Sequence, residues 1–373
     1  MRVALVHDWL NGMRGGEKVL EQLCLLYPGA AIHTLLYEPA RISPVIRAHP
    51  VKVSFIQRLP FARRHYRWYL PLFPAAIESF DLSGYDLVIS CSHCVALGAM
   101  APQDAVHFCY CLTPMRYAWD LFHSYFPPER YSWPVRSLIG WRMTRLRTWD
   151  ASAAQRVGRF VGISNHVAKR IARHYRREAG VVYPPVDTGF YTPGGAKADF
   201  SLVVSALVSY KRVDLAVEAF TRMGRPLVVI GEGPERRRLE QLAGPTVRFL
   251  GWRSDEDIRD HYRAARSFIF PGEEDFGITP LEASACGTPV VAFMAGGALE
   301  TVREDVTGVF FPEASVDSLV RAVTACDGMK FDPEEMRAHA LAFAPDRFRE
   351  QFAGEVQAAL AARHAADLGT AAP

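Results

Sequence analysis

Short apolar runs alternate with helical patterns along most of the chain, and this alternation restricts the fold more than any other feature. The runs that we predict to be strands are Val3–Val6, Ala31–Leu36, Leu87–Ser90, Val106–Cys109 and Phe160–Ile163 in the first half, and Leu202–Val208, Leu227–Ile230, Val247–Leu250, Ser267–Phe270 and Pro289–Phe293 in the second. Strand–helix–strand units of this kind build parallel sheets. We therefore predict an α/β fold of two doubly wound domains, with ligands at the carboxyl ends of the strands.

The length of 373 residues suits two domains. The boundary is expected within residues 181–195, VVYPPVDTGFYTPGG, because three prolines and three glycines cannot belong to one regular element. We place a first domain at residues 1–182 and a second at residues 183–345. The segment 346–373 is expected to form a C-terminal helix and tail that pack back toward the first domain.

The composition excludes several classes of protein. With 49% hydrophobic and 22% charged residues, it is that of a globular protein rather than a disordered, collagen-like or disulfide-stapled one. No run of about 18 apolar residues suggests a membrane span. The opening MRVALVHDWL is too short for the apolar region of a signal peptide. We therefore expect a cytoplasmic protein whose seven cysteines are thiols.

Charge is divided unevenly along the chain. Residues 1–180 hold 23 Lys and Arg against 12 Asp and Glu, whereas the remainder holds 20 against 28. Between Glu38 and Glu78 there is no acid, and a second basic stretch runs from Arg130 to Arg147, near three tryptophans. The basic residues of the first stretch are Arg41, Arg47, Lys52, Arg58, Arg63, Arg64 and Arg67, interleaved with Phe55, Phe61, Tyr66, Trp68, Tyr69 and Phe73.

Basic residues mixed with aromatic residues suit an anionic membrane surface, where cations meet headgroups and rings sit at the interface. A solvated face beside buried aromatics is the simpler alternative. Nucleic acid is disfavoured because no DNA- or RNA-binding motif accompanies the charge.

The strongest local signal is PGEEDFGITPLEASACGTPVVAF, residues 271–293. A strand is expected to end at Phe270, and Thr279-Pro280-Leu281-Glu282 fits a capping box with proline at the first helical position. The amides of Phe276, Gly277 and Ile278 at this helix start could bind an anion such as a diphosphate. Glu273, Glu274 and Asp275 would repel that anion, so they should face sugar hydroxyls instead.

EDFGITPLEASACGTPVV resembles the E-x7-E segment of the retaining glycosyltransferases of family 4, the group 1 transferases, over nearly twenty positions. The resemblance implies a GT-B fold, with two Rossmann-like domains and a cleft between them. It also implies that Glu274 contacts the donor sugar and that Glu282 binds the ribose. Completing the capping box is the simpler role for Glu282.

Other segments extend the resemblance. SALVSYKRVDLAVEAF, residues 205–220, implies that Lys211 and Arg212 neutralise the diphosphate, which is electrostatic catalysis as the sugar bond breaks. VIGEGPERRRLE implies a donor contact near Gly231. HDWLNGMRGGEKVLEQL resembles the first strand, glycine loop and helix of the family, where Gly15 and Gly16 allow close approach of a phosphate or sugar. Arg14, Arg116 and Tyr117 are expected to contact the acceptor or the sugar.

Two positions depart from the family pattern. Ala206 stands where an arginine is usual, so Arg212 or Arg14 would have to supply that charge. Leu112, within HFCYCLTPMRYAWD, stands where a histidine commonly contacts the donor sugar or the catalytic centre. That substitution weakens the assignment of sugar contacts in the first domain.

Two further patterns have simple explanations. Asp255-Glu256-Asp257 follows Ser254 at a predicted helix start, where acids complement the helix dipole, so we read it as capping rather than as a metal motif. Cys91, Cys94, Cys109 and Cys111 fall in or beside predicted strands, which favours buried thiols over a zinc site.

The reading we favour is a retaining hexosyltransferase that moves mannose from GDP-mannose to a lipid-linked oligosaccharide during surface polysaccharide or lipopolysaccharide synthesis. It would act at the inner face of the plasma membrane as a peripheral protein, with no metal and no cofactor beyond the nucleotide sugar. The alternatives are a UDP-sugar-dependent transferase of the same family, a GT-B nucleotide-sugar epimerase and a catalytically dead binding subunit.

Overall fold

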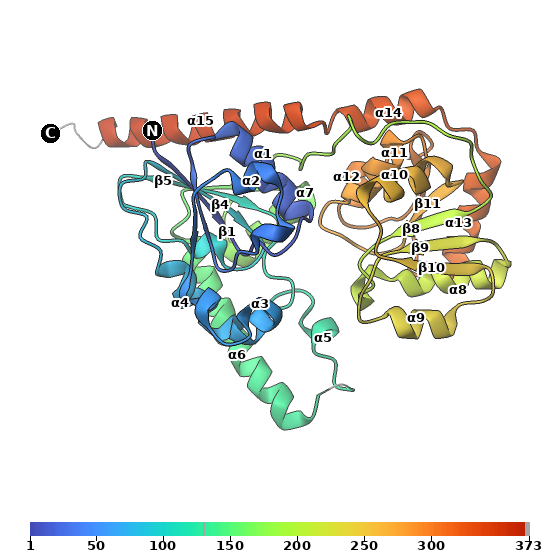
Figure 1. Ribbon diagram of the computed structural model, residues 1–373, viewed down its shortest axis with the longest axis horizontal. Helices are drawn as coiled ribbons and strands as arrows, with labels where there is room; N and C mark the ends of the chain where they lie inside the picture. The colour runs from blue at the N-terminus through green and yellow to red at the C-terminus, as the bar shows by residue number, and fades with distance from the viewer. Residues whose placement is uncertain (130, 370–373) are drawn as a thin grey trace. The chain divides into compact units, whose positions relative to one another are not determined.

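The computed structural model describes residues 1–129 and 131–369, with side chains described as far as residue 365 (Figure 1). Arg130, at the start of the second basic stretch, lies outside the described residues. The chain divides into two compact units. Unit 1 comprises residues 1–185 and 348–373, and unit 2 comprises residues 186–347.

Unit 1 is built on a seven-stranded parallel sheet in the order β3-β2-β1-β4-β5-β6-β7. Its strands are β1 Val3–His7, β2 Ala31–Thr34, β3 Val51–Val53, β4 Leu87–Ser92, β5 Val106–Cys111, β6 Arg159–Gly162 and β7 Ala179–Val181. Its helices are α1 Gly15–Leu26, α2 Pro44–Arg47, α3 Ala62–His65, α4 Phe73–Glu78, α5 Phe122–Tyr125, α6 Trp133–Ala154 and α7 Asn165–Tyr175, joined by most of α15 Pro345–Gly369.

Unit 2 is built on a six-stranded parallel sheet in the order β10-β9-β8-β11-β12-β13. The strands are β8 Ser201–Val204, β9 Leu227–Ile230, β10 Val247–Gly251, β11 Ser267–Phe270, β12 Val290–Phe293 and β13 Gly308–Phe311. The helices are α8 Val213–Met223, α9 Arg236–Leu242, α10 Asp255–Ala264, α11 Ile278–Ala285, α12 Ala298–Thr301, α13 Val316–Gly328 and α14 Pro333–Leu341.

Alternate strand residues of unit 2 feed two separate cores, one on each face of the sheet. Val203 and Ile269 pack with α8 and α13 on one face. Leu202 and Phe268 pack with α10, α11 and α14 on the other. Burial on both faces is the pattern of a doubly wound sheet, and the prediction of two such units in an α/β fold is confirmed.

The last helix packs on the sheet of unit 1 through aromatic side chains. The ring centroids of Phe352 and Phe108 lie 5.1 Å apart, and those of Phe348 and Tyr110 lie 5.7 Å apart. Phe348 and Phe352 are buried. The part of this helix from Phe348 onward therefore adds to the core of unit 1. Along the described residues, no helix has both the length and the apolar character needed to cross a bilayer.

Candidate functional site

In unit 2 the strand order reverses between β8 and β11, which are neighbours in the sheet. At such a reversal the loops after the two strands diverge and leave room for a ligand at their carboxyl ends. The loops at this point are residues 205–212 and residues 271–277. The two segments that carry most of the predicted donor site therefore meet at one edge of the sheet.

Lys211 and Glu274 form an ion pair across these two loops. The Nζ atom of Lys211 lies 2.5 Å from Oε1 of Glu274, and each side chain is only 18% exposed. Lys211 ends a 3-10 turn, Ser209–Lys211, and Glu274 lies in the loop that precedes α11. The structure therefore brings together two of the three residues that the resemblance marked as catalytic.

A glycine allows the two loops to approach this closely. A Cβ atom on Gly272 would lie 2.6 Å from the backbone oxygen of Lys211 and 2.8 Å from its Cα. Only glycine fits a backbone contact of this kind. Gly272 therefore determines how near Lys211 comes to Glu274.

A second backbone contact holds the 273–277 loop from the side of the 294–297 loop. Gly297 donates its amide to the backbone oxygen of Glu274 at 2.8 Å. A Cβ on Gly297 would lie 2.2 Å from Cα of Phe276, and one on Gly296, whose φ is +63°, would lie 2.4 Å from the oxygen of Glu274. The loop that carries Glu274 is thus enclosed between two others.

The predicted capping box at residues 279–282 is wrong. Helix α11 begins at Ile278, and its N-cap is Gly277 with φ of +102°, so Thr279 and Pro280 lie inside the first turn. Gly297 packs on the backbone of Phe276, and the chain turns into the helix at Gly277, two residues earlier than the sequence pattern suggests. The amides expected at the helix start, those of Phe276, Gly277 and Ile278, therefore lie two to four residues after Glu274.

Glu282 lies in the second turn of α11 and is buried. Its carboxylate accepts a hydrogen bond from the Tyr262 hydroxyl at 3.1 Å. Burial, reinforced by the charge of Glu282, raises the pKa of Tyr262 and of Tyr191 above the usual range. Glu282 therefore has a structural partner, Tyr262, that the sequence did not reveal.

Arg212 and Gly231 make local contacts in unit 2. Arg212, with φ of +51°, directs its guanidinium to Asp214, with Nε 3.2 Å from Oδ1. Gly231 has φ of +133°, and a Cβ there would lie 1.9 Å from the backbone oxygen of Ser205. The loop after β9 is thus packed on the loop after β8, and a role of either residue in donor binding stays a prediction.

Unit 1 has its own strand-order reversal, between β1 and β4. Asp8 follows β1, and its buried carboxylate accepts four backbone hydrogen bonds, from His93, Cys94, Val95 and Ala96, at 2.6–2.9 Å. The Nδ1 atom of His93 lies 3.0 Å from Oδ2 of Asp8. Asp8 thereby positions the whole turn that follows β4.

The electrostatics of this pair favour an ionised Asp8. Burial would raise its pKa, but the charge and hydrogen bonds of His93 outweigh burial and lower it to about 2. The side chain of His93 is 29% exposed, and the ring of Trp9 meets it edge-on with centroids 4.5 Å apart. His93 is therefore an accessible imidazole held in place at the carboxyl edge of the sheet.

The glycine loop lies beside this edge. Gly15 and Gly16 begin α1, and the amide of Arg14 donates to the Glu17 carboxylate at 3.1 Å. A Cβ on Gly16 would lie 2.9 Å from Cδ1 of Leu112. Leu112, at the position where the resemblance expects a histidine, therefore packs against the glycine loop.

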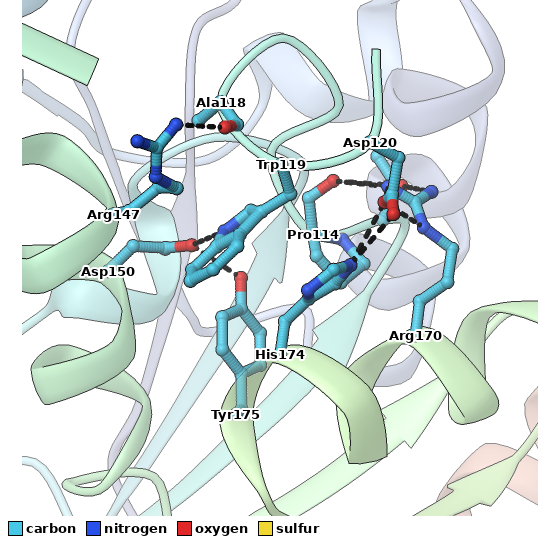
Figure 2. Close-up of polar contacts among 10 residues, drawn as sticks. Pro114, Ala118, Trp119, Asp120, Arg147, Asp150, Arg170, His174 and Tyr175 are labelled. Carbon is cyan, nitrogen blue, oxygen red and sulfur yellow. Dashed lines mark hydrogen bonds and ion pairs between the residues drawn. The ribbon is translucent and has the colours of Figure 1, made fainter. Parts of the chain in front are cut away.

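The 112–121 loop after β5 carries Arg116 and Tyr117 and is fastened from two helices (Figure 2). Arg170 of α7 donates to Asp120, Thr113 and the backbone oxygen of Pro114 at 2.6–3.2 Å. Two further contacts come from α6, where Arg147 donates to the backbone oxygen of Ala118 and Asp150 accepts from Trp119. Arg116 is half-buried in this loop, and the Tyr117 hydroxyl lies 2.9 Å from Sγ of Cys94.

Two carboxylates of this network have opposite electrostatics. Burial opposes ionisation of Asp120, but the hydrogen bond of His174 and the charge of Arg170 hold its pKa well below the usual range. Burial raises the pKa of Asp150 to about 7, despite hydrogen bonds from Trp119 and from the Tyr175 hydroxyl at 2.8 Å. Asp150 therefore changes its charge near neutral pH at the anchor of the 112–121 loop.

The predicted cap at Ser254 and the cysteine prediction are confirmed, and the structure adds a cap at Ser164. Ser254 caps α10 by accepting from the amide of Asp257, and Ser164 caps α7 by accepting from that of Val167. All seven cysteines are free and buried. Within residues 1–129 and 131–369, no group of three or more His, Cys, Asp or Glu side chains is placed to hold a metal ion.

Comparisons with known proteins agree with this architecture. Residues 195–327 match the family described as Glycosyl transferases group 1. D-inositol 3-phosphate glycosyltransferase of Geodermatophilus obscurus is 34% identical over 45% of this chain and 45% of its own length. A GDP-mannose-dependent alpha-(1-6)-phosphatidylinositol monomannoside mannosyltransferase of Mycobacterium tuberculosis is 30% identical over 50% of this chain and 57% of its own length. The chain thus spans about half the length of these relatives.

Solved structures share the fold over nearly the whole chain. Anabaena HepE in complex with UDP-glucose has a TM-score of 0.70 at 19% identity, covering 96% of this chain and 100% of its own. Sucrose-phosphate synthase from Thermosynechococcus elongatus has a TM-score of 0.71 at 18% identity, covering 97% and 100%. With the parallel sheets of both units, these structures show that the chain has the GT-B fold, and the match to the family described as Glycosyl transferases group 1 covers most of unit 2.

Proposed function

We propose that the chain is a retaining glycosyltransferase that uses a nucleotide-diphosphate sugar without a metal or other cofactor. The observation that carries the proposal is the Lys211–Glu274 ion pair at the strand-order reversal of unit 2, where Glu274 lies in the loop that leads into α11. A lysine there neutralises charge on a leaving diphosphate, and the amides at the helix start bind its oxygens. A carboxylate beside them accepts hydrogen bonds from sugar hydroxyls.

The proposed donor is GDP-mannose. The GDP-mannose-dependent relative of Mycobacterium tuberculosis supports mannose. The fold neighbour in complex with UDP-glucose makes a UDP-sugar the second candidate. In both cases Glu282 binds the ribose, the loop around Gly231 borders the base, and Lys211 with the α11 start binds the diphosphate.

The proposed acceptor is a lipid-linked saccharide at an anionic, inner membrane surface during surface polysaccharide or lipopolysaccharide synthesis. The charge division supports it, because the basic excess lies within residues 1–180. In unit 1 the acceptor would meet the carboxyl edge near His93, Arg14 and Arg116. Transfer with retention is proposed to occur by same-face attack, with the leaving phosphate taking the acceptor proton.

Titration calorimetry with GDP, GDP-mannose, UDP and UDP-glucose tests the donor. We expect GDP and GDP-mannose to bind preferentially, and Glu282→Ala to weaken both. Because Glu282 is buried against Tyr262, Glu282→Gln is measured beside it and thermal unfolding checks that both variants fold. A preference for UDP would favour a UDP-sugar over GDP-mannose as the donor. If the folded wild type binds no nucleotide, the result would support a catalytically dead binding subunit. Epimerisation of the donor without acceptor would support an epimerase.

A further inference from the structure

Unit 1 exposes large apolar side chains in two segments that also carry its unpaired basic charge. We propose that these segments form a docking surface for an anionic lipid bilayer. The inference deepens the proposed function by naming the residues that would contact lipid. The surface, called here the basic–aromatic face, comprises Phe55, Arg58, Phe61, Arg63, Arg64, Arg67, Trp68 and Leu72, together with Trp133, Val135, Leu138, Trp141, Arg142 and Arg145.

Helix α6 is apolar on two faces, but only one of them is buried. Ile139, Met143 and Leu146, spaced at helical intervals, pack into the core of unit 1. Leu138 and Trp141 follow the same spacing on the outer face and are about half exposed. Trp133 at the helix start is 81% exposed. An apolar stripe on the outside of a helix is expected where the helix lies against another apolar phase.

The outer stripe of α6 combines rings with cations. The guanidinium of Arg145 lies over the ring of Trp141, 4.0 Å from its centroid. Arg142 is exposed beside it, and no acid occurs between residues 131 and 149. Tryptophan and arginine side by side match a bilayer interface, where the ring enters the boundary region and the cation meets phosphate.

The 55–72 segment presents rings in the same way. Trp68 is 68% exposed with the ring of His65 stacked on it at 4.3 Å, and Phe61 is 76% exposed. Phe61 has φ of +55°, a left-handed conformation that is costly for an aromatic residue. The fold thus accepts backbone strain at the position where it holds this phenyl ring in the open.

The charge around these rings is uncompensated. Arg63, Arg64 and Arg67 are exposed, and within the described residues none of them forms an ion pair. No acid occurs between Glu38 and Glu78. The electrostatic complement of such a surface is a sheet of negative headgroups.

The two segments contribute to the same hydrophobic core of unit 1. Ala62, Tyr66 and Phe73 share a hydrophobic core cluster with Met143 and Leu146 of α6. In Figure 1, the first turns of α6 project from the sheet of unit 1. Both segments are therefore anchored to one core within unit 1.

Co-sedimentation with vesicles tests the proposal. We expect the wild-type chain to bind vesicles of phosphatidylglycerol and phosphatidylcholine in equal parts, to release them as salt rises, and not to bind pure phosphatidylcholine. Leu138→Ser with Trp141→Ser should weaken binding by about tenfold or more. Arg63→Gln, Arg64→Gln and Arg67→Gln should each weaken it roughly fivefold and together remove most of the salt dependence.

Matched controls separate these effects from general ones. Trp252→Ser removes a tryptophan that is 75% exposed in unit 2 and should leave vesicle binding unchanged. Thermal unfolding shows whether the variants fold, and nucleotide titration of the same samples reports on unit 2. Loss of vesicle binding with intact nucleotide binding supports the docking surface. Failure to bind any nucleotide would refute the proposed function but not this inference.

Four results would overturn the inference. Equal binding to neutral and anionic vesicles would show that the charge of the arginines does not contribute to membrane binding. Binding by the variants at the wild-type level would show that the basic–aromatic face does not contact the bilayer. Tighter binding to single-stranded RNA than to anionic vesicles, or a dimer that Trp141→Ser dissociates, would assign the surface to nucleic acid or to a second copy of the chain.

Discussion

Lys211 and Glu274 face each other at 2.5 Å across the carboxyl edge of the second sheet, largely shielded from water. In this pair each charge neutralises the other. An arriving diphosphate would compete with Glu274 for the ammonium, and the carboxylate would then be released toward the sugar. The pair therefore couples donor binding to the placement of Glu274, under the proposed function.

Replacing Lys211 with methionine should weaken binding of a nucleoside diphosphate by about 10–100-fold, because it removes one charge-assisted contact. Arg212→Gln is the matched control, since Arg212 is engaged by Asp214, and its effect should be smaller. Calorimetric titration measures both. Equal losses in the two variants would show that general positive charge, rather than the position of Lys211, is what matters.

Glycine 297 should tolerate no side chain. In Gly297→Ala the new Cβ meets the backbone of Phe276 at 2.2 Å, so we expect a loss of about 1–3 kcal/mol in the free energy of unfolding. The control is Gly328→Ala, at the end of α13, where a Cβ meets nothing within 4 Å. Urea denaturation compares them, and an unchanged stability for Gly297→Ala would contradict the described loop contact.

Asp150 should make stability depend on pH. Its pKa is raised from 3.8 to about 7, so the folded chain keeps the proton over a range where the unfolded chain has lost it. The contribution of Asp150 to the free energy of unfolding is fully present below about pH 4 and is lost as the pH rises toward 7. The loss is at most about 4 kcal/mol. Asp150→Asn stays neutral and can still accept from Trp119 and Tyr175.

Urea denaturation at pH 5 and pH 8 measures this effect. At each pH, the free energy of unfolding of the wild type is compared with that of Asp150→Asn. The variant should gain stability relative to the wild type as pH rises, and the subtraction removes contributions from the buried histidines. Parallel pH curves for the two proteins would mean that Asp150 does not titrate in this range.

His93 is expected to act on the acceptor side. In His93→Gln the four backbone hydrogen bonds to Asp8 remain, so the fold should persist. We expect kcat/KM for the acceptor to fall about tenfold or more while the Kd for the donor nucleotide is unchanged. Initial rates with varied acceptor, beside calorimetry with donor, separate the two. An unchanged kcat/KM would leave His93 as a structural residue only.

Much of the fold could be predicted from the sequence because a buried parallel strand is a continuous apolar run. Leu227–Ile230 and Ser267–Phe270 are strands with the predicted bounds. The predicted strand at residues 202–208 ends at Val204, since the chain turns there to bring Lys211 to the site. Strands β3 and β7 were missed because three residues are too few for a pattern, and the four-residue strand β13 was also missed.

The candidate site was predictable where one segment carries the signal and not where distant segments meet. Glu274 and Lys211 lie in recognisable motifs. The contact between Asp8 and His93 joins residues 85 positions apart in the sequence, and nothing local marks it. Nothing in the local sequence shows that backbone atoms of other loops lie close to Gly272, Gly296 and Gly297. A Gly-Gly pair after a predicted strand, as at residues 296 and 297, could have indicated such a close approach.

The glycines that pack the 205–212, 271–277 and 294–297 loops against one another have a consequence for how such a site can diversify. Their contacts join main chain to main chain, so an insertion in one loop would displace the other two and move Lys211 with Glu274. New sugar preferences would therefore have to arise through exchanged side chains on a fixed framework, and a library aimed at altered donor choice should hold loop lengths constant.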